Sequence, residues 1–257
     1  MTLTNPSALV NHLVDFLRQE LAQRGFKKVV VGLSGGVDSA VVARLCQEAF
    51  QENLHALLMP SSVSSKESVE HALLLCERFN LSHHIQSIAP LELAFRELHP
   101  EASPLRIGNA CARFRMITLY DFSFKENRLV VGTGNKSEIL LGYGTLYGDT
   151  ACALNPIGDL YKTEIFQLAK FLSIPDEIIQ KAPSADLFEG QSDEKELGFS
   201  YNDMDQLLFD HIELKLSKEE LLAKGHAKEL VEMVLKRIST NKFKSEMPPI
   251  AQVRGRL

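Results

Sequence analysis

Short apolar runs alternate with amphipathic segments through the first half of the chain, and this alternation constrains the fold more than any other feature. Residues 28–33, 54–59, 83–88 and 129–131 have the composition of buried strands. Helices are expected around them, at 7–24, 40–50, 66–79, 107–122 and 135–143. Strands joined by helical crossovers predict an α/β fold, doubly wound, with a mostly parallel sheet and helices on both faces.

The last third of the chain predicts helices only. Residues 163–172, 200–210, 217–224 and 227–239 have helical patterns, and no strand is expected after Pro156. Ser217 and Glu220 have the spacing of a capping box, and Gly225 suits a helix stop. The acidic stretch 186–198 predicts a mobile loop. We expect residues 1–257 to form a single domain with a helical C-terminal part.

Charge and cysteine usage exclude several classes of protein. The net charge is −5 and no long basic run is present, which argues against nucleic acid as a partner. The N-terminal segment carries polar residues within its apolar pattern, so neither a signal peptide nor a membrane span is expected there. The cysteines form no CxxC pair, which weakens zinc and redox interpretations and favours a cytoplasmic location; they are Cys46, Cys76, Cys111 and Cys152.

The turn after the first strand carries the clearest chemical signal. It reads Leu33-Ser34-Gly35-Gly36-Val37-Asp38-Ser39 and lies between a predicted strand and a predicted helix. Two glycines permit a tight turn whose amide groups point at one spot, which suits a phosphate. The segment fits neither a Walker A loop nor GxGxxG. A carboxylate beside a triphosphate implies a bridging Mg²⁺, so Asp38 is a candidate metal ligand.

A second segment of this kind follows the fourth predicted strand. It begins Gly132-Thr133-Gly134-Asn135-Lys136-Ser137-Glu138 and continues through a run rich in glycine and tyrosine to Asp149. Asn155-Pro156 and Tyr161-Lys162-Thr163 come next. This mixture is poor material for a core or a long helix, and it predicts a binding surface.

Together these motifs resemble the NAD synthetase family of N-type ATP pyrophosphatases, over roughly residues 9–249. The stretches 183–187, 191–194 and 196–198 and the Pro248-Pro249 pair add to the resemblance. It implies a Rossmann-like sheet of the adenine nucleotide alpha hydrolase type. It also implies a ligase that adenylates the nicotinate carboxylate of deamido-NAD with ATP, releases pyrophosphate, and lets ammonia displace AMP to give NAD.

The same resemblance assigns roles to individual residues. Catalytic roles fall on Asp38, Glu138 and Lys162, with Asp38 and Glu138 as Mg²⁺ ligands. Contacts to deamido-NAD fall on Arg113, Tyr143 and Lys244. Contacts to ATP fall on Gly32, Leu33, Ser34, Gly35, Gly36, Val37, Asp38, Ser39, Met59, Thr133, Lys162 and Ser184.

The resemblance also bears on partners and on details of the substrate site. It implies a homodimer with the dinucleotide near the interface, for which the helix 107–122 is suited, and a 186–198 loop that closes over the reaction. Glutamine-using relatives carry an additional amidase domain for which this chain has no room, so free ammonia is the expected donor. Leu146, Ala153 and Phe243 depart from residues common in the family, which puts details of dinucleotide contact in doubt.

Other interpretations of the same residues stay open. The chain could be a different amide-forming or tRNA-modifying ATP pyrophosphatase, or a nucleotide-binding module without activity. Asp38 and Ser39 could simply cap a helix. Lys162 and Arg113 could be surface charges, Tyr143 a core residue, and Ser184 a turn cap.

Overall fold

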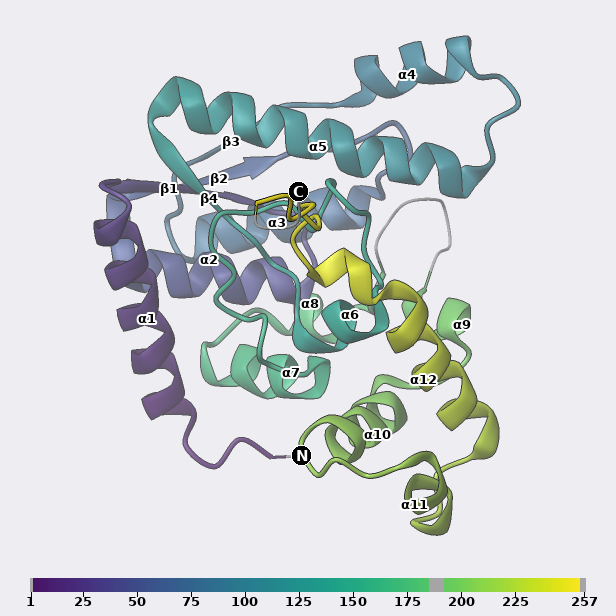
Figure 1. Ribbon diagram of the computed structural model, residues 1–257. Coiled ribbons are helices and arrows are strands. Elements are labelled where there is room, and N and C mark those ends of the chain that lie inside the picture. The colour runs from purple at the N-terminus through teal and green to yellow at the C-terminus, as the bar shows by residue number, and fades with distance from the viewer. Residues whose placement is uncertain (1, 185–191, 255–257) are drawn as a thin grey trace.

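The computed structural model describes residues 2–184 and 192–254, and it contains a four-stranded parallel sheet with helices above and below it in the view of Figure 1. The strands are β1 (Lys28–Gly32), β2 (Leu54–Leu58), β3 (His83–Ile85) and β4 (Arg128–Val131), in the order β3-β2-β1-β4. Val30 of β1 pairs in register with His55 of β2 and with Val130 of β4. The chain therefore reverses its direction of winding between β1 and β4, where open α/β sheets bind ligands.

Helices cover both faces of this sheet, as the alternation predicted. Val29 and Val31 face one core, and Val30 faces the other, because successive side chains of a strand point to opposite faces. The first core packs against α1 (Pro6–Gln23), α2 (Val37–Phe50), α3 (Lys66–Arg78) and α7 (Lys162–Phe171). The second packs mainly against α5 (Pro104–Glu126), with α4 (Ala89–Leu98) alongside it (Figure 1).

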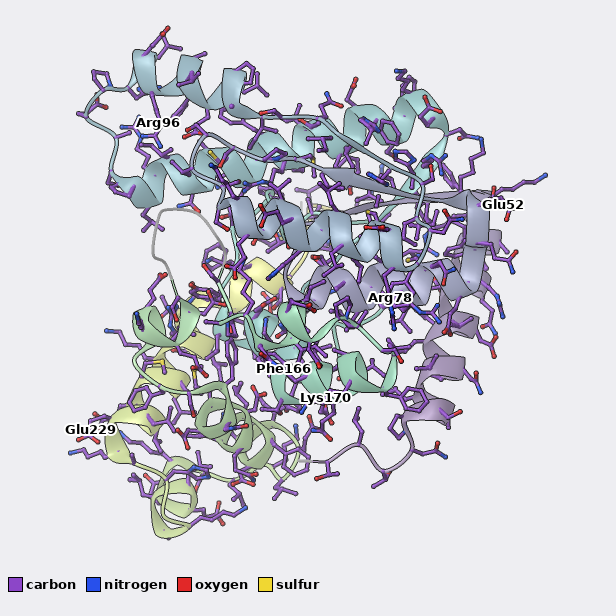
Figure 2. The ribbon with its side chains drawn as sticks, turned by 180° about the vertical axis from the view of Figure 1, so that it is seen from behind. Glu52, Arg78, Arg96, Phe166, Lys170 and Glu229 are labelled. Carbon is purple, nitrogen blue, oxygen red and sulfur yellow. The ribbon has the colours of Figure 1, made fainter. Side chains whose placement is uncertain are left out.

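The C-terminal helices form a third core beside the sheet. Leu141, Tyr161, Tyr201 and Met204 contribute to it. In Figure 2, Glu229 marks this helical part and Arg96 of α4 marks the other end of the molecule. The elements of the helical part are α6 (Lys136–Leu141), α9 (Asp193–Leu197), α10 (Tyr201–Ile212), α11 (Lys218–Ala223) and α12 (Lys228–Asn241). The short elements α8 (Asp176–Gln180), η1 (Gln51–Asn53) and η2 (Lys242–Ser245) complete the described chain.

The structure differs from the local predictions at two strand ends, at an unpredicted helix and at a predicted loop. The third strand ends at Ile85 rather than residue 88, and the neighbouring strand ends before Pro60, which lacks the N–H needed to continue the ladder. Helix α4 was not anticipated, although Pro90 stands in its first turn, where proline is favoured. Residues 193–197 of the expected 186–198 loop form α9, which ends at Gly198 with φ of 82°. Residues 186–191 lie outside the described residues.

The capping predictions for α11 are confirmed. Ser217 and Glu220 form the capping box, and Gly225, with φ of 100°, follows the helix end. Within the described residues, no helix combines the length and apolar character needed to cross a membrane.

Candidate active site

The turn between β1 and α2 leaves the start of α2 open. Gly35 has φ of 82°, and a Cβ there would lie 2.0 Å from the Ser68 carbonyl oxygen, so only glycine fits. Ser34 N donates to Ser39 Oγ at 3.2 Å, which folds the turn back on itself. Gly36 is the N-cap of α2 and provides no side-chain cap. The helix-cap interpretation of Asp38 and Ser39 is therefore wrong, and the first amides of α2 remain available to an anion.

A second turn meets the first across the switch point. Asn135, fully buried, is the N-cap of α6 and forms a capping box with Glu138. The Asn135 amide also donates to Asp38 Oδ1 at 2.9 Å. One side chain thus connects the start of α6 to the first turn of α2. No role was predicted for Asn135, although an Asn three residues before Glu138 is a helix-start signal.

Lys162, the first residue of α7, brings the two carboxylates together. Its ammonium lies 2.5 Å from Asp38 Oδ2 and 3.4 Å from Glu138 Oε1. Only 3% of the Lys162 side chain is exposed, so it is not a solvated surface charge. Three segments that are 124 and 24 residues apart along the chain meet at this cation.

The charges of this cluster depend strongly on one another. Burial, followed by the repulsion of Asp38, raises the pKa of Glu138 to about 8. Burial opposes the charge of Lys162, but the carboxylates of Asp38 and Glu138 outweigh it and raise the pKa of the ammonium. Without a further cation, Lys162 stays charged while Glu138 readily binds a proton. The cluster is therefore short of positive charge, which suits a site that takes up a metal ion.

Two tyrosines enclose the cluster from the helical part. The Lys162 ammonium lies 5.3 Å from the centre of the Tyr201 ring. Tyr201 donates to Asp193 Oδ2 at 3.2 Å, and Tyr143 donates to the other oxygen of Asp193 at 3.1 Å. The same hydroxyl lies 2.9 Å from a carboxylate oxygen of Glu196, so Tyr143 lines the cavity and is tied to α9, and it also packs against the third core.

Most residues predicted for the site line one cavity at the carboxyl ends of β1, β2 and β4. They are Gly32, Leu33, Ser34, Gly36, Val37, Asp38, Ser39, Met59, Thr133, Glu138, Tyr143, Lys162 and Ser184. Gly35 supports the turn from behind, against Ser68. The cavity brings together the open start of α2, the charged cluster and the apolar side chain of Met59.

Arg113 and Lys244 lie elsewhere. The Arg113 guanidinium is on the exposed face of α5 and donates to the Leu146 carbonyl at 3.2 Å. Lys244 Nζ donates to the carbonyls of Gly142 and Gly144 at 2.8 and 3.0 Å. Neither residue lines the cavity around Lys162. Both instead hold the segment that follows α6.

Two cations that sequence analysis did not select do line the cavity. Arg115 Nε donates to the Met59 carbonyl at 3.0 Å, and Lys181 Nζ donates to Ser68 Oγ at 2.5 Å. Arg113 and Arg115 are two positions apart on α5, so their side chains point to nearly opposite sides of the helix. The periodicity of α5 could have shown that only one of them faces the sheet.

Asp38 and Glu138 are suited to Mg²⁺ as hard oxygen donors. Both are partly exposed to the cavity, and both approach the same ammonium. Among the described residues, no group of three or more His, Cys, Asp or Glu side chains could hold a metal ion alone. Magnesium is commonly held by one or two carboxylates together with substrate phosphates and water. The residues present therefore fit a metal that arrives with a nucleotide.

Comparisons with known proteins point to one family. The NAD synthase family model matches residues 9–248. The chain is 98% identical to an NH₃-dependent NAD⁺ synthetase of Wolinella succinogenes, over 100% of both chains. It is similar to the structure of an NH₃-dependent NAD synthetase of Campylobacter jejuni, with 40% identity, a TM-score of 0.82 and coverage of 96% of this chain and 99% of that one. An NMN synthetase of Francisella tularensis gives 32% identity, a TM-score of 0.86 and the same coverage.

Proposed function

The chain belongs to the NAD synthase family, and we propose that its reaction takes place at the cluster formed by Asp38, Glu138 and Lys162. The reaction is the ATP-dependent amidation of deamido-NAD by ammonia, which gives NAD, AMP and pyrophosphate. The enzyme is a ligase that forms a C–N bond. The resemblance seen in the sequence is confirmed, and its assignment of residues to steps is what we propose here.

The β1–α2 turn holds the β- and γ-phosphates of ATP. Its uncapped helix start presents the amides of Val37, Asp38 and Ser39 to the cavity, and the N-terminal end of α2 favours negative charge. These groups bind the part of ATP that leaves as pyrophosphate. The adenine then extends toward Met59 and Thr133, at the ends of the neighbouring strands.

Lys162 stabilises the charge that develops as the nicotinate carboxylate attacks the α-phosphorus and pyrophosphate departs. The buried ammonium is already oriented by two carboxylates, so it need not reorganise during the reaction. Asp38 and Glu138 would hold a Mg²⁺ ion that, when bound, neutralises the phosphates as a Lewis acid. Ammonia then attacks the acyl carbon of the adenylate and AMP leaves.

Enclosure by Tyr143, Tyr201 and Asp193 limits the access of water to the acyl-adenylate. Hydrolysis of that intermediate would consume ATP without forming NAD. We place the nicotinate ring beside Tyr143, which lines the cavity next to the cluster. Arg113 and Lys244 remain candidates for contacts with the outer half of the dinucleotide, which reaches beyond the cavity.

The main support for this proposal is that Lys162 contacts both Asp38 and Glu138 beside the uncapped N-terminus of α2. It is tested by incubating the protein with ATP, Mg²⁺, ammonium and deamido-NAD and separating the products. Equal amounts of NAD, AMP and pyrophosphate are expected. ADP as the nucleotide product would contradict the assignment of the turn, because the β–γ bond would then be the one broken.

The mononucleotide is the sharpest alternative substrate, because the chain also resembles an NMN synthetase with a TM-score of 0.86. Both acceptors carry the same nicotinate carboxylate, so the chemistry at Lys162 would not differ. The kcat/KM values for deamido-NAD and nicotinate mononucleotide, measured side by side, separate the two. We expect deamido-NAD to be preferred, and a preference for the mononucleotide would reassign the substrate without changing the mechanism.

The assembly is proposed to be a homodimer formed through α5. Ile117, Tyr120 and Phe124 lie on one side of that helix and are 54%, 38% and 92% exposed. Apolar side chains clustered in this way commonly mark a protein interface. The four cysteines are all free thiols, which supports a reducing, cytoplasmic environment.

A further inference from the structure

Asp205 of α10 is a buried carboxylate that reaches the charged cluster from the helical part. It has no exposed surface. One of its oxygens accepts from Ser137 Oγ at 2.5 Å, and the other accepts from Thr163 N at 2.8 Å. Ser137 Oγ in turn accepts from Lys162 N at 2.9 Å. A single side chain therefore bonds the first turns of both α6 and α7.

These contacts adjoin the residues proposed to act on ATP. Ser137 directly precedes Glu138, and Thr163 directly follows Lys162. The backbone amides of Lys162 and Thr163 are therefore fixed to the same carboxylate, one through Ser137 and one directly. Any shift of α7 relative to α6 would break at least one of these hydrogen bonds. The separation of the Lys162 ammonium from the Glu138 carboxylate depends on that register.

We propose that Asp205 is a positioning residue that holds Lys162 and Glu138 at their working separation. The inference rests on the proposed function of that pair. Asp205 does not line the cavity, and its hydrogen bonds reach the pair through Ser137 and Thr163. In this arrangement the helical part contributes to the site, since α10 supplies the carboxylate that aligns two of its segments.

The same helix offers a matched control. Asp210 of α10 also has no exposed surface, but its carboxylate is bonded to Lys224 at 2.6 Å and His226 at 2.8 Å. These partners belong to the segments around α11 and do not line the cavity. Asp205→Asn and Asp210→Asn remove the same charge from the same helix at the same burial. They differ in whether the lost contacts lead to Lys162.

The test compares kcat, KM for ATP and Tm for the two variants. Asp205→Asn should lower kcat by about tenfold to a hundredfold, the usual effect of misplacing supported catalytic groups. KM for ATP should change little, because the turn at residues 34–39 is untouched. Asp210→Asn should lower Tm while leaving kcat unchanged. Equal losses of kcat in both variants, or a normal kcat in Asp205→Asn, would overturn the proposal.

Two further variants keep the outcome decisive. If Asp205→Asn does not fold, Ser137→Ala removes the hydroxyl that joins Asp205 to Lys162 N and leaves the hydrogen bond from Thr163 N to Asp205, and an unchanged kcat there would also refute the positioning role. Lys162→Met tests the proposed function separately from the role of Asp205. An active Lys162→Met enzyme would refute the proposed function itself, whereas an inactive one beside a normal Asp205→Asn enzyme would refute only the role of Asp205.

Discussion

Replacing Lys162 with methionine removes the cation of the active-site cluster while keeping much of the side-chain volume. Breaking a fully buried ion pair from one side costs about 3–5 kcal/mol. Here Asp38 and Glu138 are 16% and 21% exposed at the side chain, so water partly screens them, and Glu138, with a pKa of about 8, can bind a proton. We therefore expect unfolding to become easier by only about 1–3 kcal/mol, or a Tm lower by roughly 3–10 °C.

The effect on turnover should be much larger than the effect on stability. Loss of one preorganised group that stabilises transition-state charge lowers kcat by about 10²–10³. Thermal unfolding of each protein gives the change in stability. Initial rates of AMP formation, measured on the same preparations at a temperature below both Tm values, give the change in turnover. Most of the variant is folded under these conditions, so unfolding cannot account for a loss of that size.

Lys136→Met is the control for this experiment. Lys136 is the first residue of α6, as Lys162 is of α7, and its ammonium lies 2.7 Å from carboxylate oxygens of both Asp159 and Glu213. It does not line the cavity. Lys136→Met should therefore change Tm slightly and kcat hardly at all. Nearly normal turnover in Lys162→Met, or the same loss in both variants, would refute the electrostatic role of Lys162.

Four other predictions concern metal, ammonia, pH and assembly. Asp38→Asn and Glu138→Gln should each abolish Mg²⁺-dependent turnover and weaken the stabilisation by Mg²⁺ with ATP in a thermal-shift titration; an unchanged Mg²⁺ response would remove that residue from the metal site. Glutamine in place of ammonium should give little NAD by chromatography, and equal product from both would contradict direct use of ammonia. Burial lowers the pKa of His55 to about 4, below the unfolded value of about 6.5. Because the folded state then binds fewer protons than the unfolded state, stability should fall as the pH drops from about 6.5 toward 4. His55→Gln should flatten that part of the Tm–pH curve, and an unaltered curve would show that another group titrates. Ile117→Glu and Phe124→Glu should yield monomers in sedimentation velocity, whereas dimers of normal strength would place the interface away from α5.

Much of the sheet and of the phosphate turn could be predicted from local pattern. The β-branched run that forms β1 has to be buried, and Gly35 permits a turn that no other residue at that position would allow. Such signals are local, because strand propensity, a positive φ and helix periodicity each depend on a few neighbouring residues. The end of β3 escaped prediction because it depends on pairing with β2, whose ladder stops at Pro60, whereas α4 carried a local signal, Pro90 in its first turn, that was not used.

The sequence by itself determined the order of strands and helices, the glycine turn before α2 and the family to which the chain belongs. These depend on residue types at short, fixed spacing. Only the tertiary structure decided which charges meet. Asp38, Glu138 and Lys162 become one cluster because parallel strands end at the same edge of the sheet. Asn135 and Asp205 gain their roles through contacts with segments far away in the sequence, Asn135 with Asp38 and Asp205 with Ser137 and Thr163, and no local pattern encodes such contacts.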